Sequence, residues 1–293
     1  MTLSLHLPRH LAIALLAGVC AGNATSATLS LWSAATAAGA GATPVIQTLT
    51  LPDYDGQAHT LSTAIASYGS VADGWITASA GSFSGIAHAH ARQAVGYTGG
   101  GSLRPSVNER HVVTVQDQLL VTSATLAFGT PVDLTFSLGY NGTTSYVQSP
   151  DPVTGPSMWM GGLVVFTLDA NPTSGAQPLN LALITNQGLP AGPTSDFASG
   201  VVHSTVGATI NFQQKLDMQA DATYFDSEDR EVTVDFSHTF KLYADPALPG
   251  VSLVSQSGHN YSVSAVPEPG HAALLLLGMG LLGVRKAFAA RKG

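Results

Sequence analysis

The chain has 293 residues, of which 10% are charged, and its 18 acidic against 11 basic residues give a net charge of −7. A chain this acidic lacks the basic face that nucleic-acid phosphates require, so nucleic acid is excluded as a partner. A single cysteine excludes an internal disulfide, and stability must therefore come from the burial of apolar side chains.

The first 27 residues have the pattern of a removable signal peptide. Arg9 precedes a short apolar segment at 11–19, and small residues follow as far as Ala27. We expect cleavage after Ala27 or after Ala24. Residues 28–44 then form a low-complexity, alanine-rich stretch, which predicts a flexible spacer.

A β-domain is expected over 45–265, and it begins with a strand at 45–51. The following Asp53-Tyr54-Asp55-Gly56 contains a fragment of a calcium-loop pattern, but the other acidic ligands are absent, so it predicts an ordinary turn. Residues 60–68 are predicted as a short helix and 75–80 as a strand.

His88 and His90 form a histidine pair with metal-ligand spacing, because residues two apart project from the same side of a strand. A metal site needs a third ligand, and His111 and Glu109 are the nearest candidates in sequence. The alternative is a pair of exposed polar residues without a ligand. We assign no metal, cofactor or catalytic residue from the sequence.

The remaining body is rich in short β-branched or alternating runs, separated by turn signals such as Asn141-Gly142. The clearest strand covers 232–242, where Val232, Val234 and Phe236 share one apolar face. His238 lies on that face and is interpreted as a core or rim residue. The other expected strands cover 111–116, 119–128, 132–138, 163–169, 179–185, 201–212, 251–255 and 259–265, with a short helix at 213–220.

Two features suggest ligand binding without fixing it. Trp159, in the proline-rich loop 149–162, could stack on a sugar ring or fold onto the core. A dense acidic run offers the carboxylate oxygens that Ca²⁺ prefers, although its spacing fits no EF-hand loop and an acidic solvated face explains it equally. The run consists of Asp217, Asp221, Asp226, Glu228, Asp229, Glu231 and Asp235.

About ten short strands with little helix predict an all-β domain, specifically a single jelly-roll-like β-sandwich. The predicted order is therefore a signal peptide at 1–27, a spacer at 28–44, the sandwich at 45–265 and a separate C-terminal segment at 266–293. A hydrophobic helix is expected within that last segment.

The C-terminal segment has three parts. Val266, Pro267, Glu268 and Pro269 form an extended motif, because the two prolines fix φ and remove two N–H donors. The uncharged run 272–284 follows, and it would form a helix of roughly 20 Å at ~1.5 Å per residue. The chain then carries a basic stop that would stay on the cytoplasmic side of a membrane, made of Arg285, Lys286, Arg291 and Lys292.

This order resembles the PEP-CTERM sorting tail of Gram-negative bacteria, over about a tenth of the chain. The resemblance implies that the tail holds the protein transiently in the inner membrane until an exosortase, a membrane enzyme, processes it near Pro267-Glu268-Pro269. Delivery to the cell surface or to the exopolysaccharide matrix would follow.

Three functions are compatible with an exported protein that carries this sorting tail. The first is a non-enzymatic surface or biofilm-matrix protein, because no catalytic motif lies between the two terminal segments. The second is a carbohydrate-binding or calcium-binding module, for which Trp159 and the acidic run are the reasons. The third is a secreted glycan hydrolase, in which two carboxylates distant in sequence would meet in a cleft. We expect the first.

Overall fold

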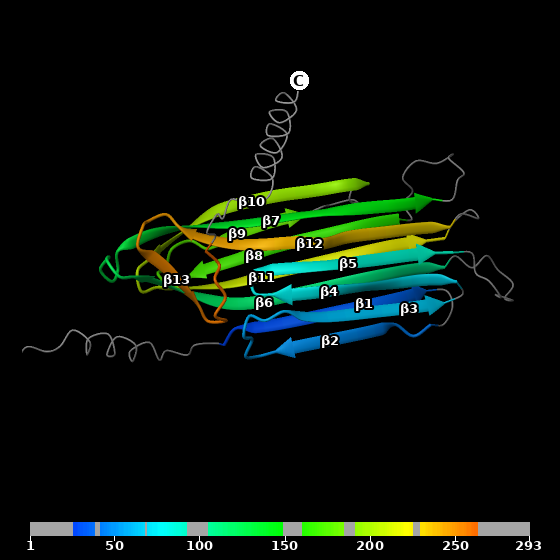
Figure 1. Ribbon diagram of the computed structural model, residues 1–293, viewed down its shortest axis with the longest axis horizontal. Coiled ribbons are helices and arrows are strands. Elements are labelled where there is room, and N and C mark those ends of the chain that lie inside the picture. The colour runs from blue at the N-terminus through cyan, green and yellow to red at the C-terminus, as the bar shows by residue number, and fades with distance from the viewer. Residues whose placement is uncertain are drawn as a thin grey trace, which may run out of the picture.

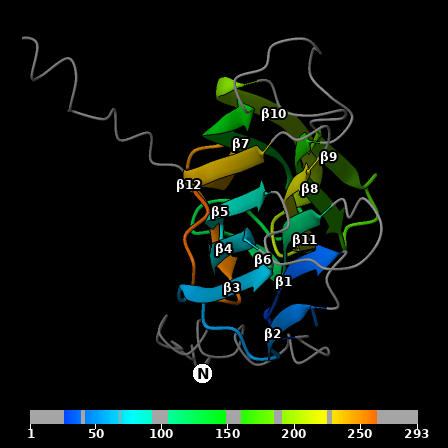
Figure 2. The same cartoon turned by 90° about the vertical axis from the view of Figure 1, so that its right-hand side faces the viewer.

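The computed structural model describes residues 26–38, 42–67, 69–92, 105–148, 160–184, 191–224 and 229–262, which form two antiparallel β-sheets. In Figure 1 the strands of both sheets run along the long axis of the molecule. Figure 2, an end view, shows the sheets as two facing layers. The two layers confirm the expected all-β sandwich, while its likeness to a jelly roll stays a prediction.

The first sheet has the order β2-β1-β6-β11-β8-β9, and β13 also pairs with β6. Its strands are β1 (Thr28–Ala38), β2 (Val45–Leu51), β6 (Ser106–Ser123), β8 (Met160–Pro172), β9 (Leu179–Ile184), β11 (Thr209–Thr223) and β13 (Val251–Ser255).

The second sheet has the order β10-β7-β12-β5-β4-β3. Its strands are β3 (His59–Ser67), β4 (Ser70–Ser79), β5 (Ser82–Ala91), β7 (Pro131–Gln148), β10 (Gly192–Thr205) and β12 (Arg230–Pro246).

Side chains alternate between the core and the outer face along most of these strands, as a period of two residues requires. The inward side chains of the two sheets meet in one aromatic cluster. Phe236 and Phe240 of β12 stack with ring centroids 5.0 Å apart, and Phe166 of β8 meets Phe240 edge-on at 5.3 Å. These contacts join the second sheet to the first, and every second residue is left facing outward.

The spacer expected over 28–44 is wrong for its first part, because β1 lies between β2 and β6 with pairing on both edges. Alternate residues of this strand, such as Leu29, Leu31 and Ala35, are fully buried. Alanine is a poor strand former on a surface, but its small side chain fits a closely packed core position. Within β1, the low complexity of the sequence thus reflects packing rather than flexibility.

Both helices predicted within the β-domain are wrong. Residues 60–67 belong to β3, and residues 213–220 belong to β11, which pairs with β6 on one edge and with β8 on the other. Gln213, Lys215 and Gln219 favour helix intrinsically, but ladder hydrogen bonds on both edges and the burial of Leu216 and Met218 outweigh that preference.

Other boundaries also change. Asn141-Gly142 is not a turn but lies inside β7, opposite the register shift between Asp235 and Thr239 of β12. A Cβ at Gly142 would lie 2.5 Å from the Phe236 ring, so a close approach of side chains explains this glycine. The strands expected at 111–116 and 119–128 form the single strand β6, which ends at Ser123.

Near the two ends of the β-domain, two predicted strands are confirmed and one is wrong. The strands predicted at 45–51 and 251–255 are confirmed as β2 and β13. The strand predicted over 259–265 is wrong for its described part, because residues 258–262 lie outside any strand. A buried carboxylate holds them instead, since Ser257 and Tyr261 donate hydrogen bonds to Asp117.

None of the described residues belongs to a helix that is long and apolar enough to cross a membrane. The expected sorting tail lies outside the described residues, and so does the expected signal peptide up to residue 25. Its last residue, Ala27, is buried, and its carbonyl oxygen accepts a hydrogen bond from Tyr54 N at 2.8 Å.

Candidate functional site

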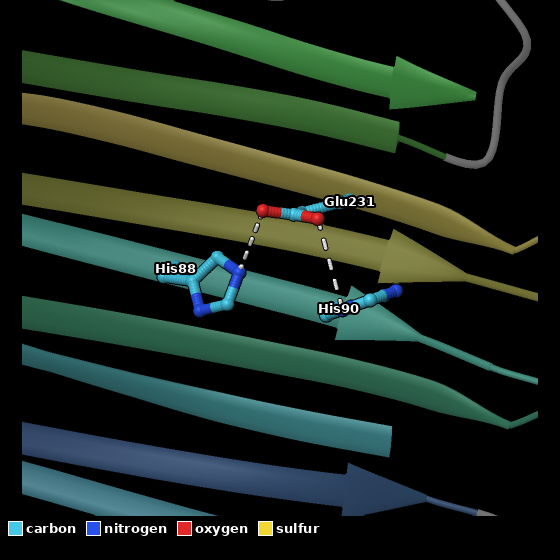
Figure 3. Close-up of side chains that lie close together, drawn as sticks. All are labelled: His88, His90 and Glu231. Carbon is cyan, nitrogen blue, oxygen red and sulfur yellow. Dashed lines mark ion pairs between the residues drawn. The ribbon is translucent and has the colours of Figure 1, made fainter. Parts of the chain in front are cut away.

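The predicted histidine pair lies on the outer face of the second sheet, and its third neighbour is Glu231. His88 and His90 both project outward from β5, and Glu231 of β12 stands opposite His90 in the ladder. His88 Nε2 lies 3.3 Å from Glu231 Oε1, and His90 Nδ1 lies 3.7 Å from Glu231 Oε2. Figure 3 shows the carboxylate with one oxygen directed toward each ring. We call these three residues the His-His-Glu group.

Two further side chains contact this group. Asp73 of β4 faces His88 across the ladder, with 2.7 Å between His88 Nδ1 and Asp73 Oδ1. Arg92, just after β5, donates from Nε to His90 Nε2 over 3.0 Å. Burial lowers the pKa of His90, and so does the charge of Arg92, while Glu231 raises it to a smaller extent. His90 is therefore neutral near pH 7.

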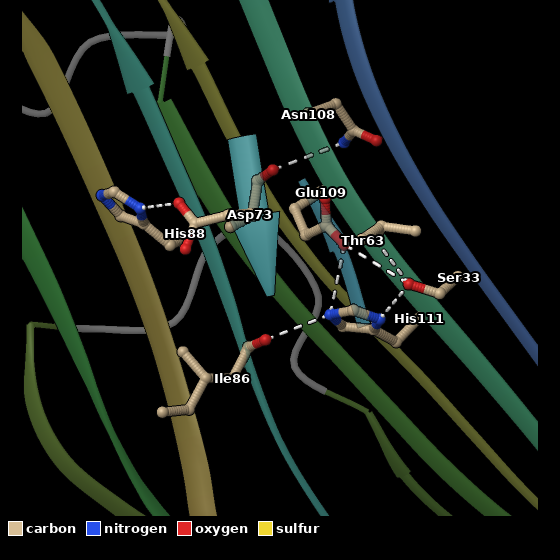
Figure 4. A network of polar contacts seen from close by, with 9 residues as sticks. Ser33, Thr63, Asp73, Ile86, His88, Asn108, Glu109 and His111 are labelled. Atoms are coloured by element: carbon tan, nitrogen blue, oxygen red, sulfur yellow. Dashed lines mark hydrogen bonds and ion pairs between the residues drawn. The ribbon is translucent and has the colours of Figure 1, made fainter. Parts of the chain in front are cut away.

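The third ligands considered from the sequence, Glu109 and His111, are not in this group. They project inward from β6, where both side chains are fully buried. Figure 4 shows His111 between Ser33 and the backbone of Ile86. The ring donates from Nε2 to Ile86 O at 3.0 Å, so its Nδ1 accepts from Ser33 Oγ at 2.9 Å.

Glu109 completes this buried network, because Thr63 Oγ1 donates to its Oε1 and itself lies 2.6 Å from Ser33 Oγ. Burial raises the pKa of Glu109 to about 8 and lowers the pKa of His111 to about 4. Both groups are therefore neutral near pH 7. A serine, a histidine and a carboxylic acid meet here as in a hydrolase, but with no exposed surface they hold the two sheets together and cannot meet a substrate.

The described residues of the acidic run are divided between two surfaces, because β11 and β12 belong to different sheets. Asp217 pairs with Arg110 through two hydrogen bonds of 2.9 and 2.6 Å, and Asp221 accepts from Asn108, all on the first sheet. Glu231 and Asp235 lie on the second sheet, and Asp226 and Glu228 lie outside the described residues. This division argues against a calcium site built from the run.

The turn with the calcium-loop fragment is an ordinary one, as predicted. Asp55 Oδ1 accepts a hydrogen bond from the backbone N of Gln57 at 3.0 Å, the two-residue spacing of an Asx turn.

Sequence reasoning missed a groove of about 850 Å³ on the outer face of the first sheet. Its outward side chains form two rows across neighbouring strands, because these residues stand opposite one another in the ladders. One row runs from β6 to β9 and consists of Gln116, Gln213, Asp169 and Asn180. The second consists of Gln118, Asn211 and Asn171. We call this surface the amide groove.

Hydrogen bonds along the first row order its side chains. Thr28 Oγ1 donates to Gln116 Oε1 over 3.3 Å, and Gln116 Nε2 donates to Gln213 Oε1 over 2.9 Å. Among the described residues, the groove is lined by no lysine, arginine or histidine, and Asp169 is the only outward carboxylate. Alternation within β6, β8 and β11 could have shown that these residues share a face, but the order of the strands was needed to place the rows together.

Several predicted site residues lie outside the described residues. These are Trp159, the sorting motif Val266, Pro267, Glu268 and Pro269, and the basic stop Arg285, Lys286, Arg291 and Lys292. The side chain of His238 also lies outside the described part.

No family model matches the chain, and no curated protein matches it. Among solved structures, the carbohydrate-binding module TmCBM61 in complex with beta-1,4-galactotriose aligns with 53% of this chain and 81% of its own, at 10% identity and a TM-score of 0.19. A structure described with carbohydrate-binding modules of the β-sandwich superfamily covers 74% of this chain and 86% of its own, at 9% identity and a TM-score of 0.13. Similarity this low adds no argument to the fold or the sites described above.

Proposed function

We propose that the chain is an exported, non-enzymatic protein of the cell surface or exopolysaccharide matrix, and that its sandwich binds matrix polysaccharide in the amide groove. The observation that carries the binding role is the pair of amide rows on the first sheet. Sorting to the cell surface is supported by the sequence, in which the Pro267-Glu268-Pro269 motif, an apolar run and a basic end follow in order.

Amide side chains suit a polyol ligand. Each sugar hydroxyl both donates and accepts a hydrogen bond, and each Asn or Gln offers an NH₂ donor and a carbonyl acceptor. Neighbouring side chains in a row stand about 4.8 Å apart, the spacing of strands in a sheet, so adjacent hydroxyls of one saccharide can be bound together. The near absence of charge in the groove disfavours phosphates and nucleic acids.

A non-enzymatic role agrees with the burial of the cluster that resembles a hydrolase site. Ser33, His111 and Glu109 are buried between the sheets, where a polysaccharide has no access.

Co-sedimentation with exopolysaccharide purified from the producing cells tests this proposal. The wild-type chain should sediment with the polysaccharide, and a double variant with Asn211→Ala and Gln213→Ala should bind at least about tenfold more weakly, as expected for the loss of a few hydrogen bonds. Gln47→Ala is the matched control, because it removes an exposed amide of β2 outside the groove. Equal binding by the double variant would reject the groove as the binding site.

A further inference from the structure

We propose that the His-His-Glu group binds a divalent transition-metal ion of the Zn²⁺ type, with Asp73 as the residue that orients His88. This site is separate from the amide groove, because His88, His90 and Glu231 lie on the second sheet and the groove lies on the first.

The spacing of the three side chains fits one ion. Each offers a ligand atom that lies within 4.8 Å of the other two. Two ligand atoms that are each ~2.0–2.1 Å from one ion at the tetrahedral angle lie ~3.3–3.4 Å apart. The distances of 3.3 Å from His88 Nε2 and 3.7 Å from His90 Nδ1 to the two oxygens of Glu231 are close to that value.

The contact with Asp73 determines which nitrogen of His88 can act as a ligand. A carboxylate only accepts hydrogen bonds, so His88 Nδ1 must donate to Asp73 Oδ1 across their 2.7 Å separation. In neutral His88 the lone pair is then on Nε2, which is a buried atom without a hydrogen-bond partner among the described residues. A carboxylate that fixes a histidine in this way is the usual outer support of a metal-ligating ring.

Nε2 of His88 and Oε1 of Glu231 are thus two electron-pair donors that face each other at 3.3 Å. Such a pair repels unless a cation lies between its members. A metal ion fills that position and also engages His90, whereas a second proton on His88 would satisfy His88 and Glu231 alone. An experiment can therefore distinguish a metal ion from a proton at this position.

The ligand types define the class of ion. Two imidazoles and one carboxylate suit Zn²⁺, Co²⁺, Ni²⁺ or Cu²⁺, while Ca²⁺ requires six to eight oxygen ligands. The side chains are 23%, 15% and 34% exposed for His88, His90 and Glu231, so an ion can reach the group from solvent. Three protein ligands leave a coordination position for a water molecule or an external group.

Arg92 competes with the ion. Its Nε donates to His90 Nε2, which keeps the hydrogen of neutral His90 on Nδ1, the atom that faces Glu231. Binding through Nδ1 requires that hydrogen to move to Nε2 and Arg92 to release the ring. Arg92 is exposed and lies beyond the end of β5, so its release costs little structure. Arg92→Ala should therefore bind the ion more tightly than the wild type.

Titration of the tag-free full chain with CoCl₂, followed by displacement with ZnCl₂, tests the site. We expect one equivalent of Co²⁺ with the intense visible absorption of four-coordinate cobalt, bleached by Zn²⁺ and unchanged by excess Ca²⁺. His88→Ala and Glu231→Gln should abolish this absorption, and Asp73→Asn should weaken affinity about tenfold while the ligands remain.

His203→Ala is the matched control. His203 Nδ1 lies 2.6 Å from Asp133 Oδ1 and so reproduces the pair of His88 with Asp73, but the described residues bring no third ligand to it. This variant should bind Co²⁺ as the wild type does. Circular dichroism of each variant checks that the sandwich is retained. Absence of the four-coordinate spectrum in the wild type, or its persistence in folded Glu231→Gln, would overturn the site. Neither result bears on polysaccharide binding, which is measured without metal.

Discussion

His111 of the first sheet donates a hydrogen bond from Nε2 to the carbonyl oxygen of Ile86 in the second sheet, over 3.0 Å. This polar contact crosses the core of the sandwich. It requires Gly74, because a Cβ at that position would collide with Ile86 O and lie 2.5 Å from His111 Nε2. A side chain at position 74 would therefore separate the partners of a buried hydrogen bond.

Gly74→Ala should destabilise the chain by about 2–4 kcal/mol, since overpacking adds to the loss of a buried hydrogen bond. The midpoint of urea unfolding measures the effect. Gly161→Ala is the control, because a Cβ there meets no atom of the described residues within 4 Å, and it should change stability far less. Equal stability of the two variants would show that the space at Gly74 is not needed.

The buried network also predicts a pH dependence. Glu109 has a pKa of about 8 in the folded chain against 4.5 when unfolded, so from pH 4.5 to 8 the unfolded chain holds fewer protons and stability falls as pH rises. The pKa of His111 is 6.5 in the unfolded chain and about 4 in the folded chain. Between these two pH values its contribution to the stability of the fold rises with pH. The two effects oppose each other below pH 6.5, and only the fall due to Glu109 remains between pH 6.5 and 8.

Glu109→Gln should remove that fall, which we expect to be about 1–2 kcal/mol at up to ~1.4 kcal/mol per pH unit. Urea unfolding of the wild type and the variant at pH 6.5, 7.2 and 8 measures it. A wild-type stability as flat as that of the variant over this range would contradict a neutral Glu109 in the folded chain.

Hydrogen bonds to Asp117 hold the segment that follows β13 in place. Its carboxylate accepts hydrogen bonds from Ser255 Oγ at 2.7 Å and from Tyr261 OH at 3.0 Å, and also from Ser257. Asp117→Asn replaces one acceptor oxygen by a donor, so we expect a loss of about 2–4 kcal/mol and faster proteolysis after Ser255. Asp133→Asn, at an exposed carboxylate, should stay within about 0.5 kcal/mol of the wild type.

If the proposed sorting holds, replacing Pro267, Glu268 and Pro269 by alanine should leave the protein unprocessed in the inner membrane, because the proposed exosortase motif would be lost. Fractionation of the producing cells and immunoblotting measure the result. Lys286→Ala, which keeps the motif and three basic residues, is the control. Normal processing of the triple variant would overturn the sorting hypothesis.

The sequence allowed the sandwich to be predicted where apolar and polar residues alternate, as at Val232, Val234 and Phe236, which are buried as expected. The sequence led to wrong predictions where the intrinsic preference of a segment disagrees with its pairing in the sheet. Gln213 and Lys215 prefer helix, yet β11 is paired on both edges, and Ala35 and Ala37 of β1 occupy core positions. Local preference is too weak to decide such segments, because a neighbouring strand outweighs it.

The site was predicted in part for the same reason. Strand alternation placed His88 and His90 on one face, and the structure agrees. Glu231 could not be chosen over Glu109, because proximity in sequence says nothing about which strand becomes the neighbour of β5. The amide rows likewise depend on the order of β6, β11, β8 and β9, which alternation alone does not determine.

The most direct test of the account is the intact mass of the protein that co-purifies with exopolysaccharide, compared with that of the protein in the membrane fraction. The account predicts a matrix-bound form that lacks about 27 N-terminal residues and the chain beyond the Pro267-Glu268-Pro269 motif. Recovery only in the membrane, with residues 270–293 still attached and no polysaccharide bound, would contradict it.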